Sequence, residues 1–272
     1  MISLKRNKKT GDLVKAKGSR VMKKYIYQPN QKDDFKVSRS KFEDFLKCEK
    51  CFYLDRVGGL ERPDIPSFTL NETTDILYKK EFDLCREKQI PHRLLVENEL
   101  SHIIPYQHED IEKWRDSLHY GLMARYKDTN IILSGGVDDV WINTNNNKLV
   151  VLDYKSQAKK IEKLNKKDYL DDVYHQSYKT QLEFYAYLLN LMGHEVDETG
   201  YFVVCNADRN KENFEKNMKF DELLVPYKLN LIWIEQKLDE MIDILNEKKL
   251  SKSNESCMNC AYQRERELLD NK

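Results

Sequence analysis

Two aspartates and a lysine stand close together in the middle of the chain. Asp153 and Lys155 directly follow an apolar run over residues 149–152, and Asp138 follows a pair of glycines one segment earlier. In a strand, residues two positions apart point to the same face, so Asp153 and Lys155 are expected to project together. The glycine pair permits a bulge or the close approach of another backbone, and Asp138 can then face Asp153.

This set of residue types suits phosphodiester hydrolysis. Divalent metal ions held by carboxylates neutralise the phosphate, generate hydroxide and stabilise the leaving oxygen, and a lysine can orient water or balance charge. An ion pair on a solvated sheet face is the competing interpretation of a single Asp-x-Lys motif, but the glycine-preceded aspartate upstream favours the metal site. Asp139 is expected to point to the opposite face and is not assigned to the metal.

A glutamine and a tyrosine provide a third element. Gln181 and Tyr185 are four residues apart in a predicted helix, so the amide and the hydroxyl share one face and can contact phosphate or base. A surface glutamine beside a half-buried core tyrosine is the other interpretation.

Four cysteines form two C-x-x-C pairs separated by about 205 residues, Cys48 with Cys51 and Cys257 with Cys260. Four thiolates satisfy tetrahedral zinc or an iron–sulfur cluster, and this spacing lets both sulfurs of a pair reach one centre. The sequence therefore predicts a metal staple that ties the first helix to the C-terminal segment. The other two cysteines, in a helix and a strand, are expected in the core.

The elements that must position these residues follow from hydrophobic periodicity and turn residues. A capping box at Ser40 predicts the start of the first helix. The predicted helices cover residues 40–56, 71–89, 111–118, 174–192 and the region from 230 onward. The predicted strands cover residues 94–104, 122–126, 131–142, 149–154, 200–205 and 222–226. The second, third and fourth of these are predicted to form an antiparallel meander.

Charge is unevenly distributed in this chain of 272 residues and zero net charge. Residues 1–24 contain nine lysines and arginines against one aspartate. We expect a basic, flexible arm over residues 1–36 that can hold a polyanion, with a solvated tail as the alternative, and a single domain over residues 37–272. No apolar run approaches the roughly 18 residues of a membrane span, and no secretory signal is evident, so a cytoplasmic location is expected.

The order of the motifs resembles the PD-(D/E)XK nuclease superfamily, specifically its RecB-like branch, which includes the CRISPR-associated RecB-like exonucleases. The resemblance rests on Gly135-x-x-Asp138, Asp153-Tyr154-Lys155 and Gln181-x-x-x-Tyr185, and it covers most of residues 38–265. It implies an α/β, restriction-endonuclease-like core with a central mixed β-sheet flanked by helices. It also implies a Mg²⁺- or Mn²⁺-dependent DNA nuclease whose metal is held by Asp138 and Asp153, with Lys155 as the catalytic lysine.

One position departs from that branch, which usually supplies a metal-binding histidine from the helix before the meander. The comparable stretch here places Asp75 at the position of the histidine. A carboxylate suits magnesium at least as well as an imidazole does. A surface aspartate in the first turn of a helix is the competing interpretation.

The cysteines resemble the same branch, in which one cysteine of the first helix and three near the C-terminus hold a four-iron cluster. Cys48, followed by Phe52-Tyr53-Leu54, is similar to that helix, but here the four ligands are divided two and two. The resemblance favours a 4Fe-4S cluster, and the division fits structural Zn²⁺ about as well. No cysteine follows Cys260.

The residues and the resemblance together imply a RecB-like, metal-dependent DNA nuclease, either an exonuclease or an enzyme that acts on single strands or DNA ends, and the choice between exonuclease and endonuclease stays open. No G-x-x-x-x-G-K-[ST] motif is present, so ATP-driven translocation would have to come from a helicase or another DNA-processing partner. A catalytically inactive DNA-binding or assembly module that keeps the fold and the staple is the main alternative. A zinc-stapled protein-interaction domain is the third.

Overall fold

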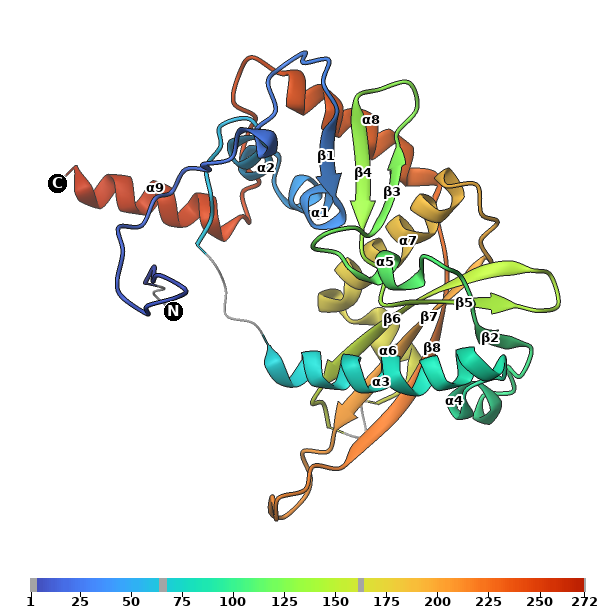
Figure 1. Ribbon diagram of the computed structural model, residues 1–272. Helices are drawn as coiled ribbons and strands as arrows, with labels where there is room; N and C mark the ends of the chain where they lie inside the picture. Colours follow the sequence, from blue (N-terminus) through green and yellow to red (C-terminus); the bar gives the residue numbers. More distant parts are fainter. Residues whose placement is uncertain (1–3, 64–67, 161–163, 272) are drawn as a thin grey trace. The chain divides into compact units, whose positions relative to one another are not determined.

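The computed structural model describes residues 4–63, 68–160 and 164–271 (Figure 1). The chain divides into two compact units. The first contains residues 1–67, 128–132 and 235–272, and the second contains residues 68–127 and 133–234.

The first unit is mainly helical. Its elements are the 3-10 helix η1 (Lys23–Tyr25), the strand β1 (Phe35–Ser38), the helices α1 (Arg39–Lys47), α2 (Glu49–Arg56) and α9 (Met258–Asp270), and most of α8 (Ile232–Asn246). The C-terminal helix α9 was not predicted from the sequence. Within the range of the expected arm, Tyr27 and Phe35 are buried and their rings meet edge to face at 5.1 Å.

The prediction of one helix over residues 40–56 is wrong, because the backbone of Cys48 is extended and separates α1 from α2. The break lets the rings of Phe45 and Phe52 meet at 5.7 Å, and both are buried. A continuous helix would separate these residues by roughly 10 Å along its axis. The predicted capping box is also wrong, since Ser40 lies inside α1 and Ser38 precedes the helix.

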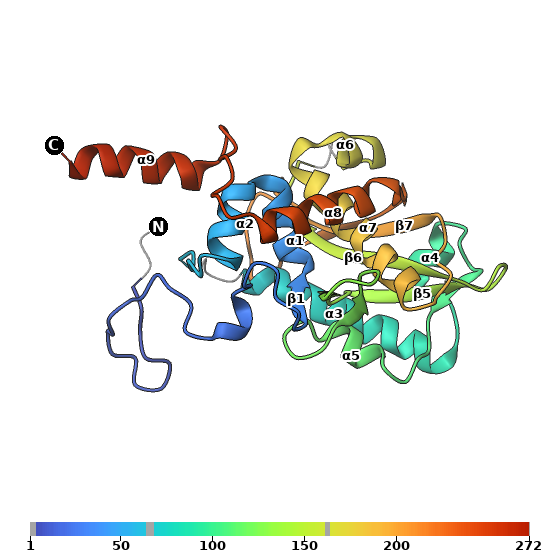
Figure 2. The same ribbon diagram turned by 90° about the horizontal axis from the view of Figure 1, so that it is seen from above.

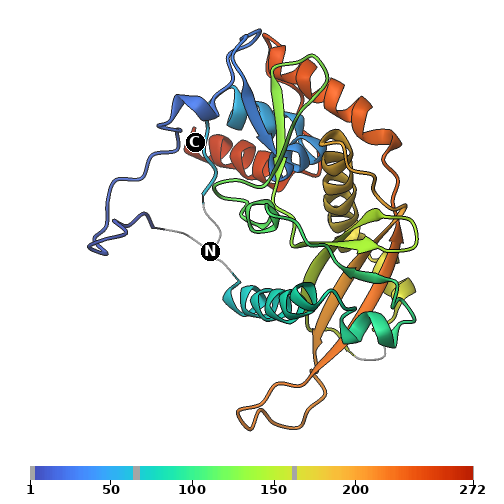
Figure 3. The same cartoon turned by 45° about the vertical axis from the view of Figure 1, so that its right-hand side comes forward.

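The second unit contains a five-stranded mixed sheet in the order β2-β5-β6-β7-β8, as expected for the predicted α/β fold. The strands are β2 (Ile103–Pro105), β5 (Asp139–Asn143), β6 (Lys148–Gln157), β7 (Thr199–Ala207) and β8 (Phe220–Lys228). β6 and β7 run parallel, and the other neighbours are antiparallel. The turn between β7 and β8 extends beyond the end of the sheet (Figure 3).

Helices flank both faces of this sheet. They are α3 (Thr69–Lys88), α4 (Arg93–Glu97), α5 (Ile111–Arg115), α6 (Lys166–Asp171), the 3-10 helix η3 (Val173–His175) and α7 (Gln176–Leu191). Phe82 of α3 packs on the face that carries Leu152 and Tyr154, whereas Leu182 of α7 approaches Val151 on the other face. Figure 2 shows α3 and α6 on opposite sides of the sheet.

The predicted three-stranded meander is wrong in its middle strand. Residues 131–142 form two strands, β4 (Ile131–Gly135) and β5, and only β5 pairs with β6, whereas β4 lies beside β3 (Leu122–Arg125) in a second sheet. The chain turns at Gly136, where a Cβ atom would lie 2.5 Å from that of Ser117. The glycine pair therefore permits the approach of another backbone, one of the two roles foreseen for it.

The predicted strand over residues 94–104 is also mostly wrong, because residues 93–97 form α4. The His92 side chain accepts a hydrogen bond from the backbone N–H of Leu94 and so caps this short helix. Leu94 and Leu95 are both buried, which the alternation of a strand does not provide. The remaining predicted elements are present with shifted ends, and α6 was not predicted.

Candidate active site and cysteine centre

Asp153 and Lys155 project from β6 on the face covered by α7. The Lys155 ammonium contacts Asp153 Oδ2, and Gln181 Nε2 donates a hydrogen bond of 2.9 Å to Asp153 Oδ1. The same amide lies 3.2 Å from the Tyr185 hydroxyl. The structure therefore brings these four predicted residues together around a carboxylate that is fully buried.

Asp138 lies beside this group, in the turn before β5. Its Oδ2 accepts a hydrogen bond of 2.9 Å from the backbone N–H of Tyr154, the residue between Asp153 and Lys155. Asp139 faces away, as expected, and pairs with arginines instead. The backbone of β6 thus helps to hold the Asp138 carboxylate next to Asp153.

The electrostatics of the group favour the binding of a cation. Burial raises the pKa of Asp153 to about 8, with Lys155 opposing the shift and Asp138 adding to it. Burial lowers the pKa of Lys155, but the two aspartates outweigh it, so the lysine stays charged. A divalent ion would favour the ionised form of a carboxylate whose proton is otherwise retained near neutral pH.

Asp75 lies near the beginning of α3 and joins the same electrostatic environment. Burial and then the charge of Asp138 raise the pKa of Asp75, against an ion pair of 2.8 Å with Lys79. The preceding residue, Thr74, contacts the hydroxyl of Ser156 on β6. These contacts locate the start of α3 beside the end of β6 that carries Lys155.

The donor set fits a divalent ion. One oxygen of Asp75 is buried without a hydrogen-bond donor, and Asp153 Oδ2 meets the Lys155 ammonium. Carboxylate oxygens are ligands that Mg²⁺ and Mn²⁺ prefer. Of the residues that the structure describes, only the four cysteines gather three or more potential ligand atoms within 4.8 Å of one another. The ligand atoms of the carboxylate site are therefore spread more widely than those of the cysteine centre.

Tyr178 was missed by the sequence analysis. Its ring lies under the Lys155 ammonium, 4.7 Å from the nitrogen to the ring centroid. Such a contact favours the charged lysine. The signal was available, because Tyr178 stands three residues before Gln181 and so shares its helix face.

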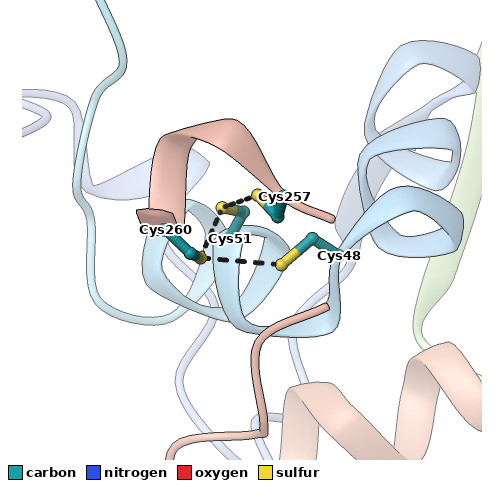
Figure 4. A group of neighbouring side chains, drawn as sticks. All are labelled: Cys48, Cys51, Cys257 and Cys260. Atoms are coloured by element: carbon teal, nitrogen blue, oxygen red, sulfur yellow. Dashed lines mark hydrogen bonds between the residues drawn. The ribbon is translucent and has the colours of Figure 1, made fainter. Parts of the chain in front are cut away.

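The four cysteines of the C-x-x-C pairs converge in the first unit, which confirms the predicted cluster (Figure 4). The sulfur atoms of Cys48 and Cys260 are 3.8 Å apart, and Cys51 lies 3.6 Å from Cys257 and 3.5 Å from Cys260. Each pair stands at the start of a helix, α2 or α9, where the helix dipole favours thiolates. Burial raises the pKa of Cys257, but hydrogen bonds from the Cys260 backbone and the neighbouring thiols outweigh it and lower the value to about 7.

The remaining cysteines lie outside this centre. Cys205 is buried in the core, as expected, whereas Cys85 is only partly buried on α3. A cavity of about 350 Å³ borders three of the four clustered cysteines, together with Lys47 and Arg62. Small molecules can therefore reach the thiols of the centre.

Comparison with known proteins gives one family. The model of the PD-(D/E)XK nuclease superfamily matches residues 69–264, which include the whole carboxylate site and the second cysteine pair. No curated protein matches the chain. The crystal structure of SSO0001 is similar at 13% sequence identity over 79% of each chain, with a TM-score of 0.32. In the described part of the chain, every helix is too short or too polar to cross a membrane.

Proposed function

The chain belongs to the PD-(D/E)XK nuclease superfamily, and on that premise we propose that it is a Mg²⁺- or Mn²⁺-dependent DNA nuclease. The observation that carries the proposal is the convergence of Asp138, Asp153 and Lys155 on one buried site. Asp75, near the beginning of α3, completes the set of carboxylates. The residues lie in the order of motifs that this superfamily shares.

Each side chain has a defined task in this proposal. Asp138 and Asp153 hold the metal, and Asp75 contributes a third carboxylate from α3. When bound, the ion neutralises the phosphate and lowers the pKa of its water. Lys155 keeps its charge beside Asp153 and balances the negative charge of the transition state, and Gln181 fixes the orientation of Asp153 through its amide.

The proposed substrate is single-stranded DNA or a DNA end, degraded in the RecB-like, exonucleolytic manner. The order and spacing of Asp138, Asp153-Tyr154-Lys155 and Gln181-x-x-x-Tyr185 support this branch. The basic residues of the N-terminal segment support binding to a polyanion. The sequence contains no G-x-x-x-x-G-K-[ST] motif for ATP-driven strand separation, so a helicase or another DNA-processing protein would supply that step.

End-labelled single- and double-stranded DNA incubated with purified protein and Mn²⁺ tests the proposal. Cleavage that requires the ion and disappears in Asp153→Ala supports a nuclease. If the wild type and Asp153→Ala bind DNA equally and neither cleaves it, the result supports the inactive DNA-binding or assembly module instead. Absence of DNA retention even at low salt supports a protein-interaction domain.

The cysteine centre is proposed to be structural, with two candidate occupants. The resemblance to the RecB-like exonucleases favours a 4Fe-4S cluster. The sulfur spacing of 3.5 to 3.8 Å favours Zn²⁺, because a tetrahedral ion with Zn–S bonds of about 2.3 Å has edges of roughly 3.8 Å. Brown protein with broad visible absorption after anaerobic purification identifies a cluster, and colourless protein with one tightly bound zinc identifies the ion.

A further inference from the structure

Asp139, the neighbour of Asp138, is fully buried and has no task in the proposed chemistry. Its Oδ1 lies 2.5 Å from the guanidinium of Arg86 and 2.8 Å from that of Arg115, and it accepts a hydrogen bond of 2.8 Å from the backbone N–H of Val140. The two arginines come from different helices, α3 and α5. A buried carboxylate is costly unless it is paired in this way, which makes the geometry of the pairing restrictive.

Tyr154 connects Asp139 to the metal site. Its hydroxyl donates to Asp139 Oδ2 at 3.3 Å, and its backbone N–H donates to Asp138 Oδ2 at 2.9 Å. The Tyr154 ring is itself fixed, stacked on Tyr78 at 5.2 Å with an angle of 6° between the planes.

The other side of Asp138 is fixed by α5 and the segment that follows it. The backbone N–H of Val137 donates to Trp114 O at 3.1 Å, and Gly136 packs directly against Ser117. Arg115, next to Trp114 in sequence, pairs with Asp139. Both neighbours of Asp138 are therefore held by the same short helix.

We infer that Arg86, Arg115 and Asp139 form a buried clamp that positions the Asp138 carboxylate and thereby sets the affinity of the site for its divalent ion. The inference rests on the proposed function, since it assigns these three as positioning residues for the proposed metal ligand. Asp83, half exposed on α3, contacts the same two arginines from the solvent side and supplies a matched control.

Asp139→Asn tests the clamp, because it removes the charge while keeping the shape. Mn²⁺ binding to the full-length protein is measured by isothermal titration calorimetry, beside the Mn²⁺ concentration that gives half-maximal cleavage. We expect affinity to fall about tenfold or more, with activity partly rescued by excess Mn²⁺. Asp83→Asn should lower the melting temperature but change Mn²⁺ affinity less than about twofold. If the melting temperature falls equally in both variants and the Mn²⁺ affinity is unchanged in both, the inference is overturned.

Tyr154→Phe keeps the test decisive if Asp139→Asn does not fold. The substitution retains the stacked ring and the backbone N–H to Asp138 and removes only the hydroxyl that reaches Asp139. A several-fold loss of Mn²⁺ affinity is expected, and wild-type affinity contradicts the clamp.

Asp138→Ala separates the two levels of the argument. If it binds Mn²⁺ as the wild type does, the proposed metal site is wrong and the clamp inference falls with it. If Asp138→Ala loses Mn²⁺ while Asp139→Asn and Tyr154→Phe retain wild-type affinity, the metal site stands and only the clamp is wrong.

Discussion

The cysteine centre and the carboxylate site gather their residues in different ways. The centre uses four identical ligands from two short motifs, with all sulfur atoms within 4.8 Å of one another. The carboxylate site draws unlike residues from α3, the turn before β5, β6 and α7, and connects them through a lysine, an amide and a backbone N–H. A complete set of protein ligands is typical of structural metal sites, whereas catalytic sites keep positions open for water and substrate.

The two regions also differ in how their charges are balanced. Burial and the proximity of other carboxylates raise the pKa values of Asp75 and Asp153, so the site carries unfavourable electrostatic energy that a cation relieves. At the cysteine centre the thiols hydrogen-bond one another. Burial raises the pKa values of Cys51 and Cys260, whereas Cys257 has a lowered pKa. Carboxylates with perturbed pKa values are typical of functional sites. A cation would stabilise the charged form of the ligands in both regions.

The largest expected effect separates chemistry from stability. Asp153→Ala should abolish cleavage, because it removes a proposed metal ligand, while the circular dichroism spectrum and melting temperature stay close to those of the wild type. Gel assays with end-labelled DNA and Mn²⁺ measure the loss. Asp171→Asn, an exposed carboxylate on α6, is the control and should cleave normally. Cleavage retained by Asp153→Ala would mean that the chemistry lies elsewhere.

Lys155→Ala refines the same distinction, since the lysine is proposed to act on the transition state and not on the metal. We expect kcat to fall by about a hundredfold to a thousandfold with Mn²⁺ affinity retained. Calorimetric titration of the folded variant with Mn²⁺ measures the second quantity. Loss of Mn²⁺ binding in this variant would make Lys155 a structural partner of Asp153.

Sequence patterns predicted which candidate residues lie together better than they predicted the elements that carry them. Asp153 and Lys155 were placed together by the strand period, and Gln181 with Tyr185 by the helix period, because both periods act within one element. The division of residues 131–142 into β4 and β5 was missed. That break depends on Ser117 packing against Gly136, a contact between segments that no local pattern contains.

The first helix was mispredicted for a similar reason. Its apolar residues fit one continuous helix, whereas the extended backbone at Cys48 accompanies a contact between the rings of Phe45 and Phe52 that helical periodicity does not reveal. The clamp was not foreseen either. Arg86 and Arg115 lie far from Asp139 in sequence, and buried ion pairs have no spacing rule of their own.

The next effect concerns the stability of the fold and not the residues of the carboxylate site. Cys48→Ser should release the metal of the cysteine centre and destabilise the protein by at least about 4 kcal/mol, since the centre joins segments 206 residues apart. Metal content and thermal unfolding measure both changes. Cys85→Ser, outside the centre, should alter neither. Wild-type stability in the metal-free variant would contradict a structural role.

A smaller effect is expected at acidic pH in the first unit. Asp55 is almost fully buried and pairs with Arg56 and Lys41. Burial alone raises the pKa of Asp55, but these partners outweigh it and lower the value to about 2, against 3.8 for the free side chain. A depressed pKa in the folded state stabilises the protein above the unfolded-state value, and the stabilisation is lost as the pH falls toward 2.

Asp55→Asn tests this dependence. The variant should be less stable than the wild type by about 2 kcal/mol at pH 6, and the difference should shrink toward zero near pH 2. Urea unfolding at a series of pH values measures it, with Glu61→Gln, an exposed carboxylate beside Arg20, as the control. A difference that is constant with pH would show that Asp55 contributes through packing and not through its charge.

The smallest effect on cleavage is expected from the basic N-terminal segment. Residues from Gly18 onward are attached to the first unit, since Gly18 accepts a hydrogen bond from the Glu61 backbone and Arg20 pairs with Asp55. Deleting residues 1–17 therefore removes six bases without disturbing those contacts.

If all six contact phosphates of single-stranded DNA, the slope of log binding constant against log salt should flatten by about 4, because each contact contributes roughly 0.7. Cleavage at low salt should stay within a few-fold of the wild type, because the carboxylate site is intact. A slope unchanged by the deletion, measured by fluorescence anisotropy between low and moderate salt, would show that the segment contacts no DNA and that binding depends on the surface around the carboxylates alone.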